Sequence, residues 1–160
     1  MREEHEVERS SHAIYGLIII TATLVADRVF AEDAIKSLLA LWGAAAVLVL
    51  AHVYAAAVAE IGEKGRWLTH AEEHVLIVDN IPVLAAVIVP SLLLVASAVG
   101  WLDLAVALDL SIILSIAGLF VVGAYQARRQ HASTAIQVGL GSVGGLIGII
   151  IVVLEVALAH

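Results

Sequence analysis

Five long apolar segments, separated by short polar connections, constrain this chain more than any other feature of its sequence. They cover about 10–27, 37–60, 81–101, 102–126 and 133–159. About 20 apolar residues cross the hydrocarbon core of a bilayer as an α-helix. A helix is required, because an isolated strand leaves its backbone polar groups unpaired in lipid. The sequence therefore predicts an all-α polytopic transmembrane helix bundle with five spans, built as a single membrane domain over residues 1–160.

Composition supports this fold class and excludes several others. Hydrophobic residues make up 62% of the chain and charged residues 14%, against about 45–50% and roughly 25% in soluble domains. The net charge of -7 disfavours a nucleic-acid partner, which would need a basic face. The absence of cysteine excludes disulfides and thiolate metal sites. The partner that the composition indicates is the lipid bilayer.

The distribution of basic residues predicts the orientation. With five spans, the N-terminus, the 61–80 connection and the 127–132 turn share one side, while the 28–36 loop and the C-terminus share the other. The first side carries Arg2, Arg9, Lys64, Arg66, Arg128 and Arg129, and the second carries Arg28 and Lys36. Positive charge favours the cytoplasmic side. We therefore expect a multi-pass protein of the cell membrane with its N-terminus in the cytoplasm and its C-terminus outside.

The two polar stretches on the cytoplasmic side differ in character. Residues 1–9 form an acidic N-terminal arm, which lacks the basic start of a signal peptide, so we expect the first apolar segment to be retained. In the 61–80 connection, Gly62 and Gly65 are expected to end the second helix after Glu60. Thr69 and Glu72 then have the spacing of a capping box. This pattern predicts a short amphipathic helix that runs into the third span.

The same connection contains a candidate metal site. His70 and His74 are four residues apart and share a helical face with Glu73, while His12 and the N-terminal glutamates lie on the same side of the membrane. Histidine and carboxylate ligands without cysteine suit Fe(II), Mn(II) or Zn(II). The motif is not that of a zinc protease, because Ala71 and not glutamate follows the first histidine. The alternative interpretation is a solvated face of a surface helix.

Polar residues within or beside the spans are further candidates, because ionisable groups are costly in lipid. His52 lies in the second span and Asp109 in the fourth, and Asp79 and Asn80 stand at the start of the third. Pro90 lies inside the third span, where it is expected to kink the helix and free a carbonyl one turn back.

The last span carries a packing signature. Gly141, Gly145 and Gly148 lie on one face, and Gly144 begins a second pair of small residues. Such faces let helix backbones approach closely. The face can serve packing within the chain or a contact between copies, and we expect a homo-oligomer.

The sequence contains no phosphate-binding loop, dinucleotide fingerprint or nucleophile elbow, so we expect no enzymatic activity. We predict a small transporter or ion-handling protein, with a divalent metal as one candidate for its cargo. The alternative is a non-catalytic interaction or scaffold subunit. A transporter should contain a polar cavity at mid-membrane near His52, Asp109 and Pro90, whereas a scaffold should be filled and dry.

Two resemblances accompany these predictions. The stretches SHAIYGLIIITATLVAD, AHVYAAAVAE and LEVALAH resemble a group of small integral membrane proteins of actinobacterial type that has no assigned activity. The topology, with a His- and Glu-containing cytoplasmic segment between the second and third spans, is similar to that of the vacuolar iron transporter family. That family carries methionines and an acid in its transport core, whereas the only methionine here is Met1 and the first span has no acid before Asp27.

Overall fold

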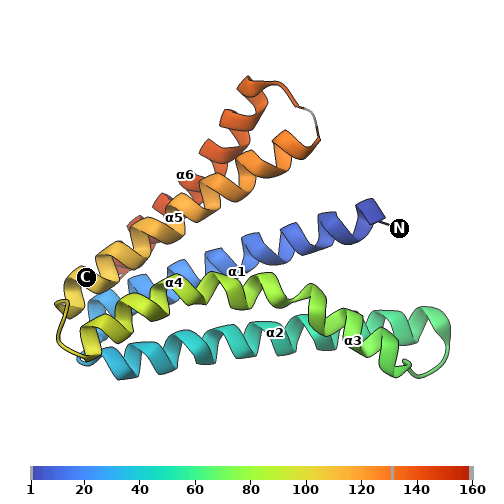
Figure 1. The fold of residues 1–160 in the computed structure, drawn as a ribbon, viewed down its shortest axis with the longest axis horizontal. Coiled ribbons are helices and arrows are strands. Elements are labelled where there is room, and N and C mark those ends of the chain that lie inside the picture. Colours follow the sequence, from blue (N-terminus) through green and yellow to red (C-terminus); the bar gives the residue numbers. More distant parts are fainter. Residues whose placement is uncertain (1, 131, 159–160) are drawn as a thin grey trace.

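The computed structural model describes residues 2–130 and 132–158, and the described part is entirely helical apart from short connections (Figure 1). The helices are α1 (Arg2–Phe30), α2 (Ala34–Lys64), α3 (His70–Asp79), α4 (Ile81–Ala98), α5 (Leu104–Arg129) and α6 (Thr134–Leu158). Five stretches are long and apolar enough to cross a membrane: α1 from Ala13, α2, α3 with α4, α5, and α6. The predicted all-α architecture with five candidate spans is therefore confirmed.

Several predicted helix boundaries are wrong in instructive ways. The acidic arm is helical, since α1 begins at Arg2, and Arg28 lies in α1 and not in a loop. The second helix passes Gly62 and ends only at Gly65, whose φ of 62° is left-handed. A glycine inside a helix costs only about 1 kcal/mol, whereas the residue that ends one must often adopt positive φ, which glycine does without strain. Gly65 therefore stops the helix and Gly62 does not.

The helices converge at one end of the molecule and separate at the other (Figure 1). The end where α1 and α4 finish and where α2 and α5 begin is called the closed end. The open end holds the start of α1, the 61–80 connection and the α5–α6 turn. Toward the open end the α5–α6 hairpin diverges from α1, α2 and α4. Burial along α5 agrees, because after Ser115 only Leu119 and Ala127 are buried.

The core cluster lies toward the closed end. It is made of apolar side chains from α1, α2, α4 and α5 that are almost wholly buried, namely Ile20, Leu24, Val25, Leu41, Ala45, Val87, Leu94, Leu108 and Ile112. Toward the open end, α1 remains against α4, because a Cβ on Gly16 would lie 3.2 Å from the Val83 Cα. The divergence therefore separates the α5–α6 hairpin from an α1–α4 pair that stays together.

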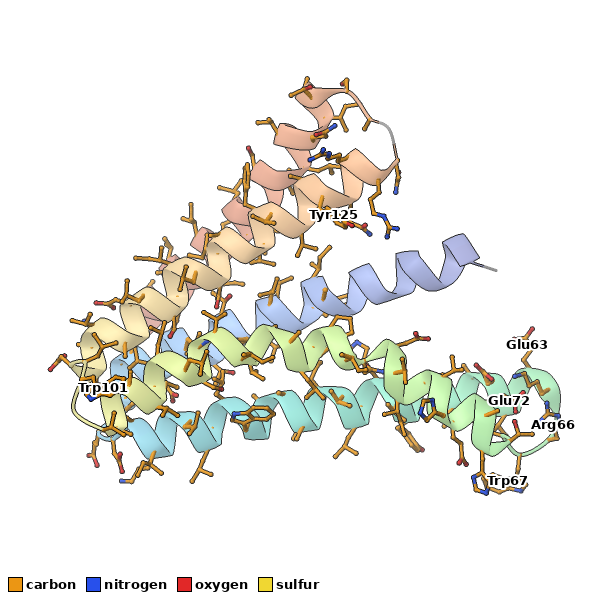
Figure 2. All side chains as sticks on the ribbon, viewed as in Figure 1. Glu63, Arg66, Trp67, Glu72, Trp101 and Tyr125 are labelled. Atoms are coloured by element: carbon orange, nitrogen blue, oxygen red, sulfur yellow. The ribbon has the colours of Figure 1, made fainter. Side chains whose placement is uncertain are left out.

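Tryptophans mark both ends of the molecule. Trp67 is 83% exposed at the open end and Trp101 is 82% exposed at the closed end (Figure 2). Trp101 follows Gly100, whose φ of 81° makes the tight turn between α4 and α5. Exposed tryptophans at both ends of a helical bundle are typical of the two membrane interfaces.

Glycines hold α5 and α6 together along their length. A Cβ on Gly144 would lie 2.7 Å from the Leu119 carbonyl oxygen, and one on Gly141 would lie 2.9 Å from that of Phe120. Gly148 faces Ile116 in the same way, while Gly145 is at the margin, 3.9 Å from the Phe120 Cβ. The glycine face named from the sequence is therefore occupied inside the hairpin, and a contact between copies would have to use another surface.

The substitution Gly144→Ala should destabilise the hairpin by about 1–3 kcal/mol, because the new methyl group would have to push the Leu119 backbone aside. Gly139→Ala is the matched control, since nothing lies within 4 Å of a Cβ at that position of the same helix. The measurement is the free energy of unfolding in mixed detergent micelles. Equal stability of the two variants would show that the α5–α6 contact is not tight.

Candidate functional site

A partly open cavity of about 260 Å³ lies beside Pro90, midway along α4, and is lined by residues of three helices. Its lining includes Leu17 of α1, Ala86, Val89 and Pro90 of α4, and Leu114, Ser115 and Gly118 of α5. On α1 and α5 these positions lie on the open-end side of the core cluster, whereas on α4 Val89 and Pro90 lie between the core residues Val87 and Leu94. The cavity therefore borders the core cluster on the side from which the α5–α6 hairpin diverges.

Two polar groups interrupt the apolar wall of this cavity. Pro90 has no backbone N–H, so the Ala86 carbonyl lacks its usual helical donor four residues on. Across the cavity, Ser115 is only 4% exposed and contributes to the lining from α5. In hydrocarbon an unpaired carbonyl is costly. The site therefore combines an apolar shape with one acceptor and one hydroxyl.

His52 lies elsewhere, on the face of α2 toward α1. Its Nδ1 is 2.9 Å from the Leu48 carbonyl oxygen, and its ring centroid is 6.0 Å from that of Tyr15 at a tilt of 48°. Neither His52 nor Asp109 lines the cavity beside Pro90. The cavity beside Pro90 therefore does not group these two residues with Pro90, and the polar cavity expected near His52 and Asp109 stays a prediction.

Asp109 instead pairs with Arg28 and joins α5 to α1 near the closed end. The Arg28 Nε donates to Asp109 Oδ1 at 2.6 Å, and Nη2 lies 3.4 Å from Oδ2. Arg28 was expected in a loop and lies in α1, and this pair was not predicted from the sequence. The available signal was that an acid within an apolar span needs a cation, and that the only basic residues expected at that end were Arg28 and Lys36.

Asp79 and Asn80 lie at the junction of α3 and α4, and both are buried, with 5% and 3% exposure. The Asn80 Nδ2 donates to the Leu76 carbonyl oxygen at 2.8 Å. The Asn80 Oδ1 is buried and has no partner among the described residues. Asn80 thus ends α3 and precedes α4, which begins at Ile81 with Pro82 in its first turn.

The predicted metal ligands are only partly brought together. The His70 Nδ1 lies 3.2 Å from Glu73 Oε2, and His70, Glu73 and His74 are all exposed. His12 lies on α1, but its side chain is outside the described part of the structure. Among the described residues, no three histidine or acidic side chains form a group able to hold a metal ion.

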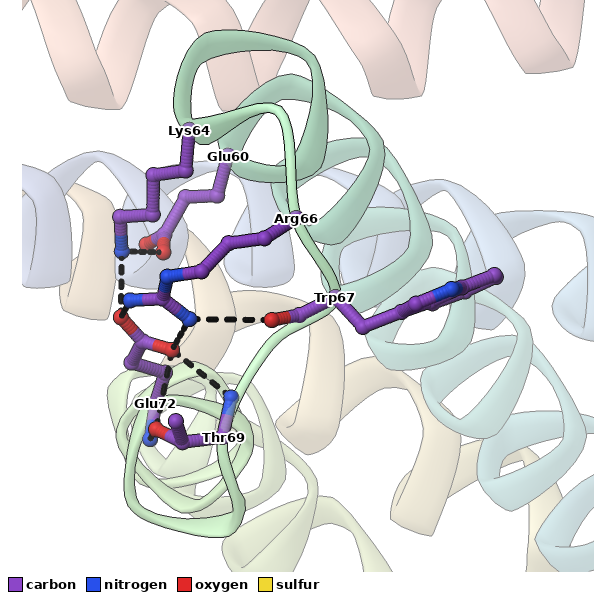
Figure 3. Close-up of polar contacts among 6 residues, drawn as sticks. All are labelled: Glu60, Lys64, Arg66, Trp67, Thr69 and Glu72. Carbon is purple, nitrogen blue, oxygen red and sulfur yellow. Dashed lines mark hydrogen bonds and ion pairs between the residues drawn. The ribbon is translucent and has the colours of Figure 1, made fainter.

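The same stretch contains an ion-pair network that the sequence analysis did not anticipate (Figure 3). The capping box of Thr69 and Glu72 is confirmed. The Glu72 carboxylate also accepts hydrogen bonds from Lys64 at 2.8 Å and from Arg66 at 2.9 and 3.0 Å, and Lys64 in turn donates to Glu60 at 2.6 Å. Glu72 therefore ties the end of α2 to the start of α3.

The surroundings of Glu72 favour its charged form. Glu72 lies in the first turn of α3, which is separate from α4 and is joined by ion pairs to the polar end of α2. Hydrogen bonds from Arg66 and Lys64, with those from Thr69, hold the pKa of the Glu72 carboxyl well below its usual range. The stability that the network contributes is therefore fully present above the ordinary pKa of 4.5, and it is lost as the pH falls from there through the lower pKa of the folded protein.

The fold describes a polytopic helical membrane protein with five candidate spans, and the cavity lies beside Pro90 among α1, α4 and α5. Comparisons of the chain with protein families, with curated proteins and with solved structures gave no match. The interpretation of the site therefore rests on its own geometry.

The substitution Glu72→Gln should accelerate amide hydrogen exchange over residues 69–75 several-fold, because the capping acceptor loses its charge and its ion pairs with Lys64 and Arg66. Glu73→Gln is the matched control, since the contact described for Glu73 is with His70 alone. In the unmodified chain, protection of these amides should be the same at pH 7 and pH 5. Equal rates of amide exchange in the two variants would show that Glu72 does not stabilise the start of α3.

Proposed function

We propose that this chain is a small membrane transport protein that holds an uncharged solute at mid-membrane and opens alternately at its two ends. The observation that carries the proposal is the position of the cavity beside Pro90. It lies between a packed, closed end and a pair of diverging helical units. A solute site in many transporters lies near the bilayer midplane, beside an interrupted helix.

The lining of the cavity favours an uncharged solute. None of its lining residues has an ionisable side chain, and Ser115 carries the one polar side chain among them. Ala86, whose carbonyl loses its helical donor at Pro90, also belongs to the lining. An ion at this depth would need compensating charge, because the cost of an isolated charge in an apolar site is large. Transport of a divalent ion through this cavity is therefore less compatible with the geometry than transport of a neutral molecule.

The arrangement of contacts supports movement of two units against each other. The α5–α6 hairpin is held by glycine contacts along its length, and α1 is held to α4 at Gly16. Between these units the contact is concentrated at the closed end, in the core cluster and the Arg28–Asp109 ion pair. Rotation of the hairpin about the cavity would bring the helices together at the open end and separate them at the closed end. Positive charge at the open end supports a cytoplasmic location for it.

The proposal predicts two distance populations for spin labels placed across the two units. The chain contains no cysteine, so labels attach only where cysteines are introduced. Val58→Cys with Val121→Cys reports the open end, and Ile35→Cys with Val106→Cys reports the closed end; all four side chains are exposed. In lipid nanodiscs, each pair should show a second distance besides that of the conformation described here. This second distance should be shorter for the pair at the open end and longer for the pair at the closed end.

The ion pair provides the control for this measurement. The double variant Arg28→Ala with Asp109→Ala removes both partners. It should raise the population in which the helices are separated at the closed end by up to about fivefold, because a partly exposed ion pair contributes about that much. A single fixed distance at both ends, unchanged in this double variant, would contradict transport. It would favour the alternative of a static scaffold subunit.

A divalent metal at the open end is a separate proposal, supported by the contact between His70 and Glu73 with His74 one turn further along α3. Two histidines and one carboxylate leave an open site, which His12 or a glutamate of the N-terminal arm would complete. Such a site would bind Fe(II), Mn(II) or Zn(II), and it would be separate from the cavity, whose lining contains none of these residues.

Calorimetric titration of these three ions tests the metal proposal. The unmodified chain should bind at least one of them, and binding should weaken below about pH 6.5 as the imidazoles protonate. The double variant His70→Ala with His74→Ala should lose this binding, while Glu63→Gln, an acid outside this face, should retain it. Equal binding by the unmodified chain and the histidine variant, or no binding by either, would refute the site.

A further inference from the structure

We propose that the cavity beside Pro90 binds a neutral amphiphile with a hydroxyl group, which enters from the bilayer between α4 and α5. The hydroxyl would lie between the Ala86 carbonyl and Ser115, and the apolar part would follow the cavity wall toward the lipid. As a statement about the transported substrate, this inference rests on the function proposed above. As a statement about a binding site, it stands on the cavity alone.

The need for a hydrogen-bond donor follows from Pro90. The proline removes the N–H that would otherwise pair with the Ala86 carbonyl, and both residues line the cavity. A purely hydrocarbon ligand would leave this carbonyl unpaired in an apolar site, which is unfavourable. A hydroxyl can donate to the carbonyl and accept from Ser115, whose side chain lines the opposite wall. The two polar groups therefore select an alcohol or phenol over an alkane.

The route from the bilayer follows from the exposure of the cavity rim. Val89 on α4 and Leu114 on α5 both line the cavity and are 48% and 46% exposed. Ala85, which lines it one turn before Val89, is also exposed. In a membrane these side chains face lipid, so the cavity wall is continuous with the lipid-facing surface between the two helices. A membrane-soluble molecule can therefore reach the site without crossing the packed closed end.

The volume sets the size of the bound part. A water molecule occupies about 30 Å³ in the liquid, and a methylene group is of similar size. A cavity of about 260 Å³ is therefore large enough for a chain of several such groups. The ligand portion held inside the protein is thus comparable to a medium-chain alcohol, and any longer tail would extend into lipid.

Photolabelling in nanodiscs tests the proposal with two matched probes: 3-azioctanol, which has a hydroxyl, and 3-azioctane, which lacks it. Peptide mass spectrometry should locate 3-azioctanol adducts on cavity residues such as Leu17, Val89 and Leu114. At equal membrane concentrations, 3-azioctanol should label these residues about fivefold more than 3-azioctane, as one additional hydrogen bond allows. Labelling of lipid-facing residues elsewhere should be equal for the two probes.

Three variants assign the effect to particular groups. Ser115→Ala should reduce the preference for the alcohol, whereas Ser111→Ala, one turn away and bonded to the Ala107 carbonyl, should not. Pro90→Ala should abolish the preference, because it supplies an N–H to the Ala86 carbonyl in a more regular helix. Ala85→Phe should block labelling by filling the rim, whereas Ile88→Phe, on the lipid-facing side of the same helix, should leave it unchanged.

The outcomes separate this inference from the proposed function. Equal labelling by the two probes, or cavity labelling that survives Ala85→Phe, would overturn the ligand class even if the spin labels show two populations. Selective labelling that Pro90→Ala abolishes would support the ligand class. If the spin labels then show one fixed distance, the site binds its ligand without transporting it, and the proposed function fails while the site stands.

Discussion

The structure depends on one property of the bilayer interior, which is that it cannot pair the polar groups of the backbone. This constraint makes every span a helix and makes each departure from a regular helix costly. The described spans contain one interior proline, Pro90, and the cavity lies beside it. The same constraint explains why Asp109 is paired with Arg28, since an isolated carboxylate near the hydrocarbon would be unfavourable. The main candidate site thus adjoins the point where the helical pattern is broken.

Close packing divides the molecule into two units with different internal contacts. Within the α5–α6 hairpin, glycines allow backbone atoms of the two helices to approach closely, as at Gly144 and Leu119. Between the hairpin and the other helices, large apolar side chains make the contact, and they are gathered toward the closed end. Side-chain contacts can be exchanged more readily than tight backbone contacts. This difference is the physical basis for treating the hairpin as one moving body.

The polar network around Glu72 has a different role from the cavity. It joins the end of α2 to the first turn of α3 through Lys64, Arg66 and Thr69. Ion pairs in such exposed positions contribute little to global stability, but they define where the helix begins and how the chain turns between the two spans. The neighbouring face of α3, with His70 and His74, is left exposed.

The sequence alone determined the fold class, the number of candidate spans and the capping box at Thr69, because these follow from hydropathy and from contacts between neighbours in the chain. It also identified Pro90 and the glycines of the last span as special positions. Only the tertiary structure decided that Arg28 pairs with Asp109, that Glu72 joins two helices and that the cavity borders Ser115 and not His52. Those pairings depend on how the helices are rotated and placed against each other, and periodicity within one helix does not contain that information.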